Sequence, residues 1–103
     1  MKVKFTLHWS DRAENKFREI IKRIVKEFGS NAAEKFIAKV EQSIAALVEM
    51  PEAFPKTSAR KNVRRCVISK QTTAFYFVTK DTVEIVTLFH TRQSPKKLKK
   101  ELK

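Results

Sequence analysis

Two helix-length stretches separated by the chain's only glycine constrain its fold most strongly. Apolar residues recur every three or four positions over residues 13–28 and again over 33–48, which is the spacing of one face of a helix. Gly29 is a natural stop for the first helix, because glycine adopts a positive φ without a steric penalty. The short link makes the helices an antiparallel hairpin, whose two apolar faces need a common partner.

The ends of both helices carry recognisable capping residues. Ser10 precedes the first stretch as an N-cap, because its hydroxyl can accept a hydrogen bond from an unpaired amide of the first turn. Asn31 is the predicted N-cap of the second stretch, with Glu34 three positions later in a capping-box pattern. The second helix ends before Pro51, since proline disfavours helical geometry in the residue before it.

The remaining segments have the features of strands and a loop. Residues 3–8 alternate apolar and polar side chains with the period of two expected of a half-buried strand. Three further strands are predicted, over residues 63–69, 73–79 and 82–90, after a loop over 51–62. The order is β-α-α-β-β-β: an α+β fold with a mostly antiparallel sheet and the N-terminal helical hairpin packed on one face. We expect a single domain over residues 1–103, with the second face of the sheet open.

The charge of the chain favours a polyanion or an acidic protein as its partner. Lysine and arginine number 23 against 11 aspartate and glutamate residues, for a formal net charge of +12. The excess lies in the second half, because residues 51–103 carry 13 basic and 4 acidic side chains, a balance of +9. We therefore expect the binding surface to come from that half.

The cysteine content and the absence of long apolar runs limit the class of protein further. A single cysteine, Cys66, allows no intrachain disulfide, which fits a reducing cytoplasm. No second Cys and no His lies near it at ligand spacing, so we expect no metal site, and nothing in the sequence indicates a cofactor. No apolar run reaches the length of a signal peptide or a membrane span, and we expect a soluble protein that has no membrane partner.

Together these features resemble the RelE/ParE superfamily, the toxins of bacterial type II toxin–antitoxin pairs, which are often called plasmid stabilisation proteins. The resemblance covers nearly the whole chain. It rests on the order of elements and on four local patterns: Trp9-Ser10 before the first helix, Met50-Pro51 after the second, Val63-Arg64-Arg65 at a strand start, and FHTRQSP over residues 89–95.

The resemblance implies a cytoplasmic toxin that inhibits growth and is neutralised by a co-encoded antitoxin in a toxin–antitoxin hetero-oligomer. The superfamily contains two activities. ParE-like members poison DNA gyrase without known hydrolytic chemistry, whereas RelE-like members cleave mRNA in the decoding site of the ribosome. Whether this chain is an enzyme depends on which of them it follows.

A RelE-like ribonuclease would need a proton-transferring group and cations around the scissile phosphate. His90 is the candidate for proton transfer, since the unperturbed pKa of histidine is about 6.5. Arg92, with Arg64 or Arg65, would hold the phosphate. Regular alternation from Glu84 along the last strand would place His90 and Arg92 on one face. The catalytic set that we assign to this alternative is His90, Arg92 and Arg65.

Two departures from the nuclease pattern favour the ParE-like alternative. The nuclease members usually have a basic residue early in the third strand, where this chain has Thr73, and a tyrosine or comparable group beyond the last strand, whereas no tyrosine follows Tyr76 here. We therefore favour a gyrase-directed, non-hydrolytic toxin. The alternatives are a ribosome-dependent mRNA endoribonuclease, a basic nucleic-acid-binding module without toxin activity, and a degenerate or differently targeted member of the superfamily.

Binding of the target or of nucleic acid is expected to depend on basic residues of the second half. These are Lys56, Arg60, Lys61, Arg64, Arg65 and Arg92. Neighbours on a strand point to opposite sides, so only one of Arg64 and Arg65 faces the open side of the sheet, and the sequence does not say which.

Overall fold

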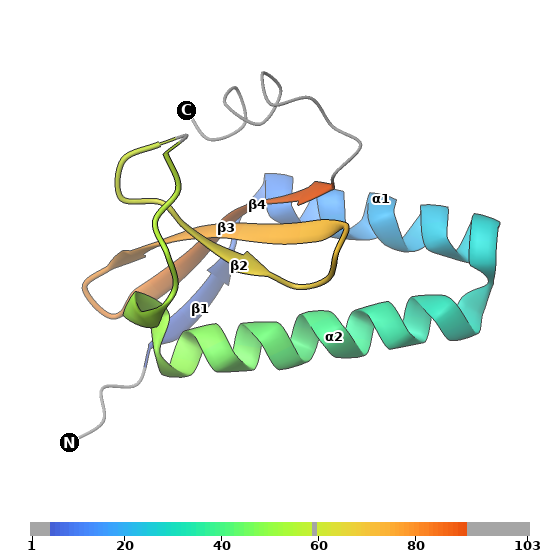
Figure 1. The fold of residues 1–103 in the computed structure, drawn as a ribbon, viewed down its shortest axis with the longest axis horizontal. Helices are drawn as coiled ribbons and strands as arrows, with labels where there is room; N and C mark the ends of the chain where they lie inside the picture. The colour runs from blue at the N-terminus through green and yellow to red at the C-terminus, as the bar shows by residue number, and fades with distance from the viewer. Residues whose placement is uncertain (1–4, 59, 91–103) are drawn as a thin grey trace.

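The computed structural model describes residues 5–58 and 60–90. Its elements follow the predicted order: strand β1 (Thr6–Trp9), helix α1 (Asp11–Phe28), helix α2 (Ser30–Glu49), a short 3-10 turn η1 (Pro51–Ala53), and strands β2 (Arg64–Val67), β3 (Thr72–Thr79) and β4 (Thr82–His90). Figure 1 shows the two helices as an antiparallel hairpin beside the sheet. The predicted α+β class and the helical hairpin are both confirmed.

β4 lies inside the sheet although it comes last in the chain. The strand order is β1-β4-β3-β2. β4 pairs in parallel with β1 and antiparallel with β3, and β3 pairs antiparallel with β2. The sheet is therefore mostly antiparallel, as predicted, and its one parallel pair brings the first and last strands side by side.

The main core lies between the helical hairpin and the sheet. α1 packs on β1 and β4, whereas α2 lies nearer β2 and η1. The buried residues of this core are Ala13, Phe36, Val40, Ile44, Leu47, Cys66, Ile68, Ala74, Tyr76, Val83, Ile85 and Leu88. Each large apolar side chain contributes roughly 1.5–3 kcal/mol when it is fully buried, so this layer supplies most of the stabilisation. No helix in the described part of the chain is both long and apolar enough to cross a membrane.

A bulge in β4 changes the direction in which its last side chains point. In the register with β3, Tyr76 pairs with Ile85 and Phe75 pairs with Thr87, which leaves Val86 without a partner. One extra residue in a strand shifts the alternation of faces by one place. Side chains that follow Val86 therefore lie on the opposite side from the one that an uninterrupted strand would give them.

The predicted N-cap of α1 is confirmed, and that of α2 is wrong. Ser10 Oγ accepts a hydrogen bond of 3.0 Å from the amide of Ala13. Helix α2 begins at Ser30, so its N-cap is Gly29 and not Asn31. Gly29 has φ 93° and ψ 173°, a region of backbone space that is essentially restricted to glycine. One residue thus ends α1 and begins α2, and Asn31 falls inside the second helix.

Three strands differ in extent from the prediction, and the smallest difference is in β3, which begins at Thr72, one residue before the predicted 73–79 segment. β1 runs to Trp9, one residue beyond the predicted 3–8 segment, whose first two residues lie outside the described part of the chain. β2 is shorter than the predicted 63–69 segment. It stops before Ile68, because the amides of Ile68 and Ser69 both donate to the carbonyl oxygen of Thr72 in the tight turn to β3.

Candidate functional site

Arg65 lies on the side of the sheet away from the helices. Residues that pair directly across antiparallel strands point to the same side, and Arg65 pairs with Phe75. Phe75 and Val63 form a second buried cluster on that side, with Phe77, Val86 and Phe89 packed against it. We call this side the open face, and Arg65 is exposed on it.

His90 lies on the opposite side, which carries the main core. It pairs with Thr72, and Thr72 stands two residues before Ala74, a core residue under the helices. Leu88, two residues before His90, is buried in the same core. The register therefore places His90 on the helix side of the sheet and Arg65 on the open face.

The regular alternation predicted for the last strand is wrong. Glu84 pairs with Phe77 and so faces the open side, whereas His90 faces the helix side. The physical reason is the bulge at Val86, which the alternation of apolar and polar residues in the sequence does not indicate. Arg92, the third residue of the predicted catalytic set, lies outside the described residues.

Arg64 holds the loop that precedes β2. It pairs with Tyr76 and so lies on the helix side. Its Nη1 donates hydrogen bonds to the carbonyl oxygens of Glu52, at 3.1 Å, and Phe54, at 2.6 Å. The guanidinium of Arg64 is therefore engaged within the protein, and of the two arginines it is Arg65 that faces the open side.

Tyr76 holds the same loop from inside the core. Its side chain is fully buried, and its hydroxyl donates a hydrogen bond of 2.5 Å to the carbonyl oxygen of Pro51. Burial raises the pKa of Tyr76 to about 12, although the nearby Arg64 lowers it in part. Burial likewise raises the pKa of the Cys66 thiol. Both groups are therefore protonated at neutral pH and act as structural residues.

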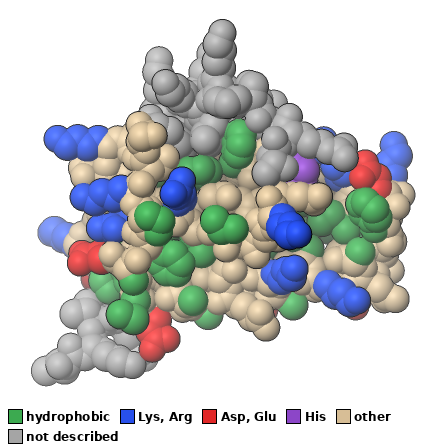
Figure 2. Space-filling view, viewed as in Figure 1, with side chains coloured by type: hydrophobic (Ala, Val, Ile, Leu, Met, Phe, Trp, Pro, Cys, Tyr) green, Lys and Arg blue, Asp and Glu red, His purple; other side chains and the backbone are tan. Residues whose placement is uncertain are grey.

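Lys56, Arg60 and Lys61 form a cationic rim at the end of the sheet where the loop approaches β3. All three side chains are exposed, and Arg60 Cζ lies 6.0 Å from the ring centroid of Phe77. Within the described part of the chain, none of the three forms an ion pair with a carboxylate. Figure 2 shows basic side chains gathered over this end of the molecule, at the left of the view. Their charge is available to an anionic partner.

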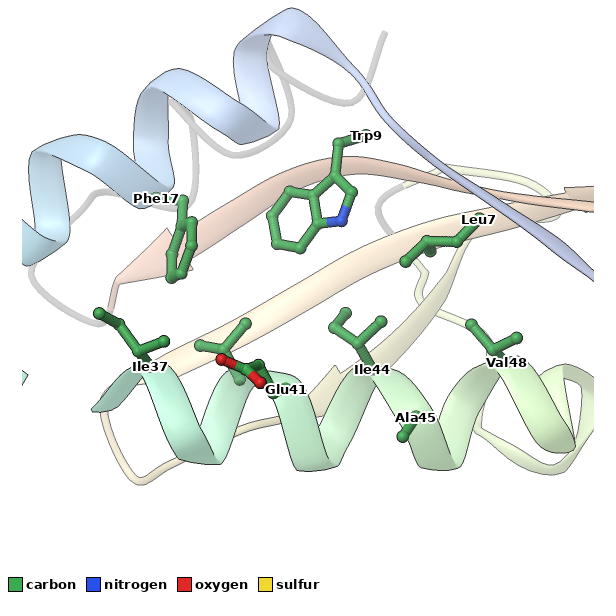
Figure 3. A pocket seen from close by; sticks show the side chains of 9 residues that line it. Leu7, Trp9, Phe17, Ile37, Glu41, Ile44, Ala45 and Val48 are labelled. Atoms are coloured by element: carbon green, nitrogen blue, oxygen red, sulfur yellow. The ribbon is translucent and has the colours of Figure 1, made fainter. Parts of the chain in front are cut away.

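An apolar groove that the sequence did not reveal lies between β1 and α2. Its volume is about 420 Å³, and Figure 3 shows side chains of the two elements pointing toward one another across it. The lining residues are Leu7, Trp9, Phe17, Ile37, Val40, Glu41, Ile44, Ala45 and Val48. Helical periodicity identified most of these residues as core, but it cannot show that two packed layers leave a gap. Among residues 5–58 and 60–90, no group of three or more His, Cys, Asp or Glu side chains is placed to hold a metal ion.

Several solved structures that are similar to this chain are of toxins and toxin–antitoxin complexes. The ParDE system of Pseudomonas aeruginosa aligns with a TM-score of 0.75 at 17% identity, covering 84% of this chain and 96% of that chain. The DinJ–YafQ complex of Escherichia coli gives 0.65 at 11% identity, covering 87% and 96%. The RelBE2 complex of Mycobacterium tuberculosis gives 0.61 at 18% identity, covering 87% and 94%. At these identities the likeness concerns the fold.

The family of the chain can be assigned from the sequence itself. A search of the curated proteins found no match to this chain. The model of the family described as the ParE toxin of the type II toxin–antitoxin system parDE matches residues 7–95, which is most of the sequence. The chain belongs to this ParE toxin family, within the RelE/ParE superfamily.

Proposed function

We propose that this toxin inhibits growth by binding DNA gyrase, and that it does so without hydrolysing nucleic acid. The gyrase target is what the resemblance to ParE-like toxins implies, and the family match over residues 7–95 supports it. The proposal that the toxin does not hydrolyse nucleic acid rests on one observation, which is that His90 and Arg65 lie on opposite faces of the sheet. Proton transfer and phosphate contacts must meet at one phosphodiester, and these two side chains do not share a face.

The proposed target contact is the open face with its basic neighbours. Arg65 lies above the apolar cluster of Val63 and Phe75, and the cationic rim lies at the end of the same strands. Val63 and Phe75 are themselves buried, so the contact would be made by the exposed side chains of Arg65 and the cationic rim, and arginine is enriched in protein interfaces.

A co-encoded antitoxin is the proposed partner that neutralises the toxin in a hetero-oligomer. The ParDE, DinJ–YafQ and RelBE2 structures are of toxin–antitoxin systems, and we extend that assembly to this chain. The formal net charge of +12 suits a partner with an acidic surface, because complementary charge accelerates association and excludes wrong partners.

The test is to express the chain alone from a tightly repressed promoter and to compare growth, DNA breaks, supercoiling by purified gyrase and mRNA integrity. We expect growth arrest with DNA breaks, inhibited gyrase and intact mRNA. Cuts at codon positions in mRNA, with intact DNA, would establish the ribonuclease alternative in its place. A chain that leaves growth unaffected would exclude both activities.

Two variants sharpen this test. His90→Ala is expected to keep growth inhibition within about twofold, since no proton transfer is required of it. Arg65→Gln is expected to weaken inhibition of gyrase by roughly tenfold, the effect of losing one charge-assisted contact. Arg23→Gln, an exposed arginine of α1, is the matched control and should behave as the unmodified chain. Loss of toxicity in His90→Ala with retained stability would count against the proposal.

A further inference from the structure

Glu41 is a charged residue in the apolar stripe of α2 that lines the groove between β1 and α2. It lies four residues after Ile37 and three before Ile44, so the three side chains share one face of the helix. Figure 3 shows Glu41 on the α2 side of the groove, with the rings of Trp9 and Phe17 on the other side. Among the described residues that line the groove, it is the only charged one. A position that the helical period assigns to an apolar side chain therefore carries a carboxylate.

The carboxylate of Glu41 has no partner within residues 5–58 and 60–90. It forms no ion pair and no hydrogen bond in that part of the chain. Its own helix supplies no cation from the neighbouring turns, because the residues three and four positions away are all apolar: Ile37, Ala38, Ile44 and Ala45. Glu41 is also exposed, so a cation that enters the groove can reach its carboxylate.

The opposite side of the groove offers two aromatic rings. Trp9 and Phe17 pack against each other, with 5.5 Å between the ring centroids and 33° between the ring planes. Aromatic rings bind alkyl and aryl groups, and the face of a tryptophan ring also attracts a cation. The groove volume of about 420 Å³ is within the range of roughly 300–1,000 Å³ that is usual for small-molecule sites. The groove thus combines an apolar surface of ligand size with a single negative charge.

We propose that this groove binds a small amphiphilic cation, a molecule that has an apolar alkyl or aryl body and a single amine or guanidinium group. The body lies against Trp9, Phe17 and Ile44, and the charged nitrogen pairs with the carboxylate of Glu41. A neutral molecule of the same shape buries the same apolar surface but leaves Glu41 without a partner. An anion of that shape places a second negative charge beside the carboxylate, and like charges in contact are unfavourable.

The net charge of the protein makes a preference for cations informative. A chain with a formal net charge of +12 attracts anions and repels cations in general. Selection of a cation must therefore come from the groove and not from the charge of the whole molecule. The groove lies on the helix side of the sheet, whereas the proposed gyrase contact lies on the open face, so either proposal can fail without the other.

Three probes of similar shape test the proposal on the full chain: phenylbutylamine, phenylbutanol and phenylbutyrate. Trp9 is the only tryptophan of the sequence and lines the groove, so its fluorescence reports whether the groove is occupied. We expect the amine to bind about three- to tenfold more tightly than the alcohol, which is the gain from one charged contact at an exposed carboxylate. Phenylbutyrate should bind most weakly. An amine that binds no more tightly than the other two probes would overturn the proposal, as would the absence of binding by all three.

Matched variants assign the binding to Glu41 and to the groove. Glu41→Gln should weaken binding of the amine about three- to tenfold and leave that of phenylbutanol within about twofold. Glu34→Gln removes the same charge from an exposed position of α2 outside the groove and should change neither affinity. Ala45→Leu adds bulk to the lining and should weaken both probes roughly fivefold or more, whereas Ala46→Leu, at the next exposed position outside the groove, should not.

Three results with these variants would contradict the proposal. Equal weakening by Glu41→Gln and Glu34→Gln would mean that general electrostatics select the amine. Unchanged affinity in Ala45→Leu would place the bound amine outside the groove. A dimer that sedimentation detects and that the amine does not dissociate, with Trp9 fluorescence changing as the dimer forms, would mean that a second copy of the chain fills the groove.

Discussion

The hydroxyl of Ser10 donates a hydrogen bond of 2.7 Å to the main-chain carbonyl oxygen of Val86. The same hydroxyl oxygen accepts the bond from the amide of Ala13 that caps α1. One side chain thus fixes the start of the first helix and the bulge of the last strand. Because the bulge decides the face on which His90 lies, this contact links a helix cap to the geometry of the candidate site.

Replacing Ser10 with alanine is expected to lower the free energy of unfolding by about 2–2.5 kcal/mol. The helix cap contributes roughly 1 kcal/mol and the bond to Val86 a further 1–1.5 kcal/mol. Urea denaturation followed by circular dichroism measures the change. Ser10→Thr keeps the hydroxyl and should cost less than about 1 kcal/mol. Equal stability of the alanine variant and the unmodified chain would mean that neither bond matters.

The neighbouring arginines of β2 are expected to respond differently to the same substitution. Arg64→Gln loses the bonds to the carbonyls of Glu52 and Phe54 and should destabilise the fold by about 1–2 kcal/mol. Arg65→Gln, exposed on the open face, should change stability by less than about 0.5 kcal/mol. Thermal or urea unfolding of the two variants measures the difference.

Binding of a single-stranded oligonucleotide, used as a general polyanion probe, gives the complementary readout. Arg65→Gln should reduce the slope of log affinity against log salt concentration by about 0.7, the value for one phosphate contact on a single strand. Arg64→Gln should leave that slope unchanged. A reversed pattern would show that Arg64 is the exposed cation and that the loop has another anchor.

Stability is expected to fall at alkaline pH because of Tyr76. Its pKa is about 12 in the folded protein against a usual value of 10.0, so the unfolded chain releases this proton first as the pH rises. The stabilisation is complete below pH 10 and is lost between about pH 10 and 12. Tyr76→Phe should flatten that part of the stability profile, measured by urea unfolding from pH 8 to 12.

Cys66→Ala serves as the reference for this profile. The pKa of Cys66 is also raised, from 9.0, so removal of its thiol should lessen the fall that begins near pH 9 and leave the part attributed to Tyr76. Tyr76→Phe should in addition destabilise the protein at neutral pH by roughly 1–2 kcal/mol, since the Pro51 carbonyl loses its buried donor. An unchanged alkaline slope in both variants would refute the assignment.

Gly29→Ala is expected to destabilise the helical hairpin by roughly 1–3 kcal/mol through backbone strain alone. The added Cβ would meet no atom within 4 Å, so the cost comes from the φ of 93° and not from a clash. Ser30→Ala, at the next position and exposed, is the control and should stay within about 0.5 kcal/mol. Thermal unfolding of the two variants distinguishes strain from a general effect of substitution at this turn.

Most of the fold could be predicted from the sequence because it depends on periodicity. The two helical stripes, the cap at Ser10 and the last strand over residues 82–90 all follow local rules that the structure obeys. The cap of α2 was predicted wrongly because Gly29 is both the C-cap of α1 and the N-cap of α2. Asn31 has a favourable capping-box pattern, but it lies inside the second helix and not at its start.

The candidate site was harder to predict because it depends on register. The bulge at Val86 follows from how β4 fits between β1 and β3, and no composition or period of β4 marks it. For the same reason the sequence could not decide between Arg64 and Arg65, since the face of each is set by its partner in β3. Two cavities that Asn62 and Val78 both line likewise arise from the different lengths of the neighbouring strands β2 and β3.

The inner position of β4 also has a consequence for how the toxin is made. Translation produces the helical hairpin first, with its apolar face uncovered, and β1 has no strand beside it until residues 82–90 have left the ribosome. The nascent chain therefore cannot complete its sheet before β4 has left the ribosome.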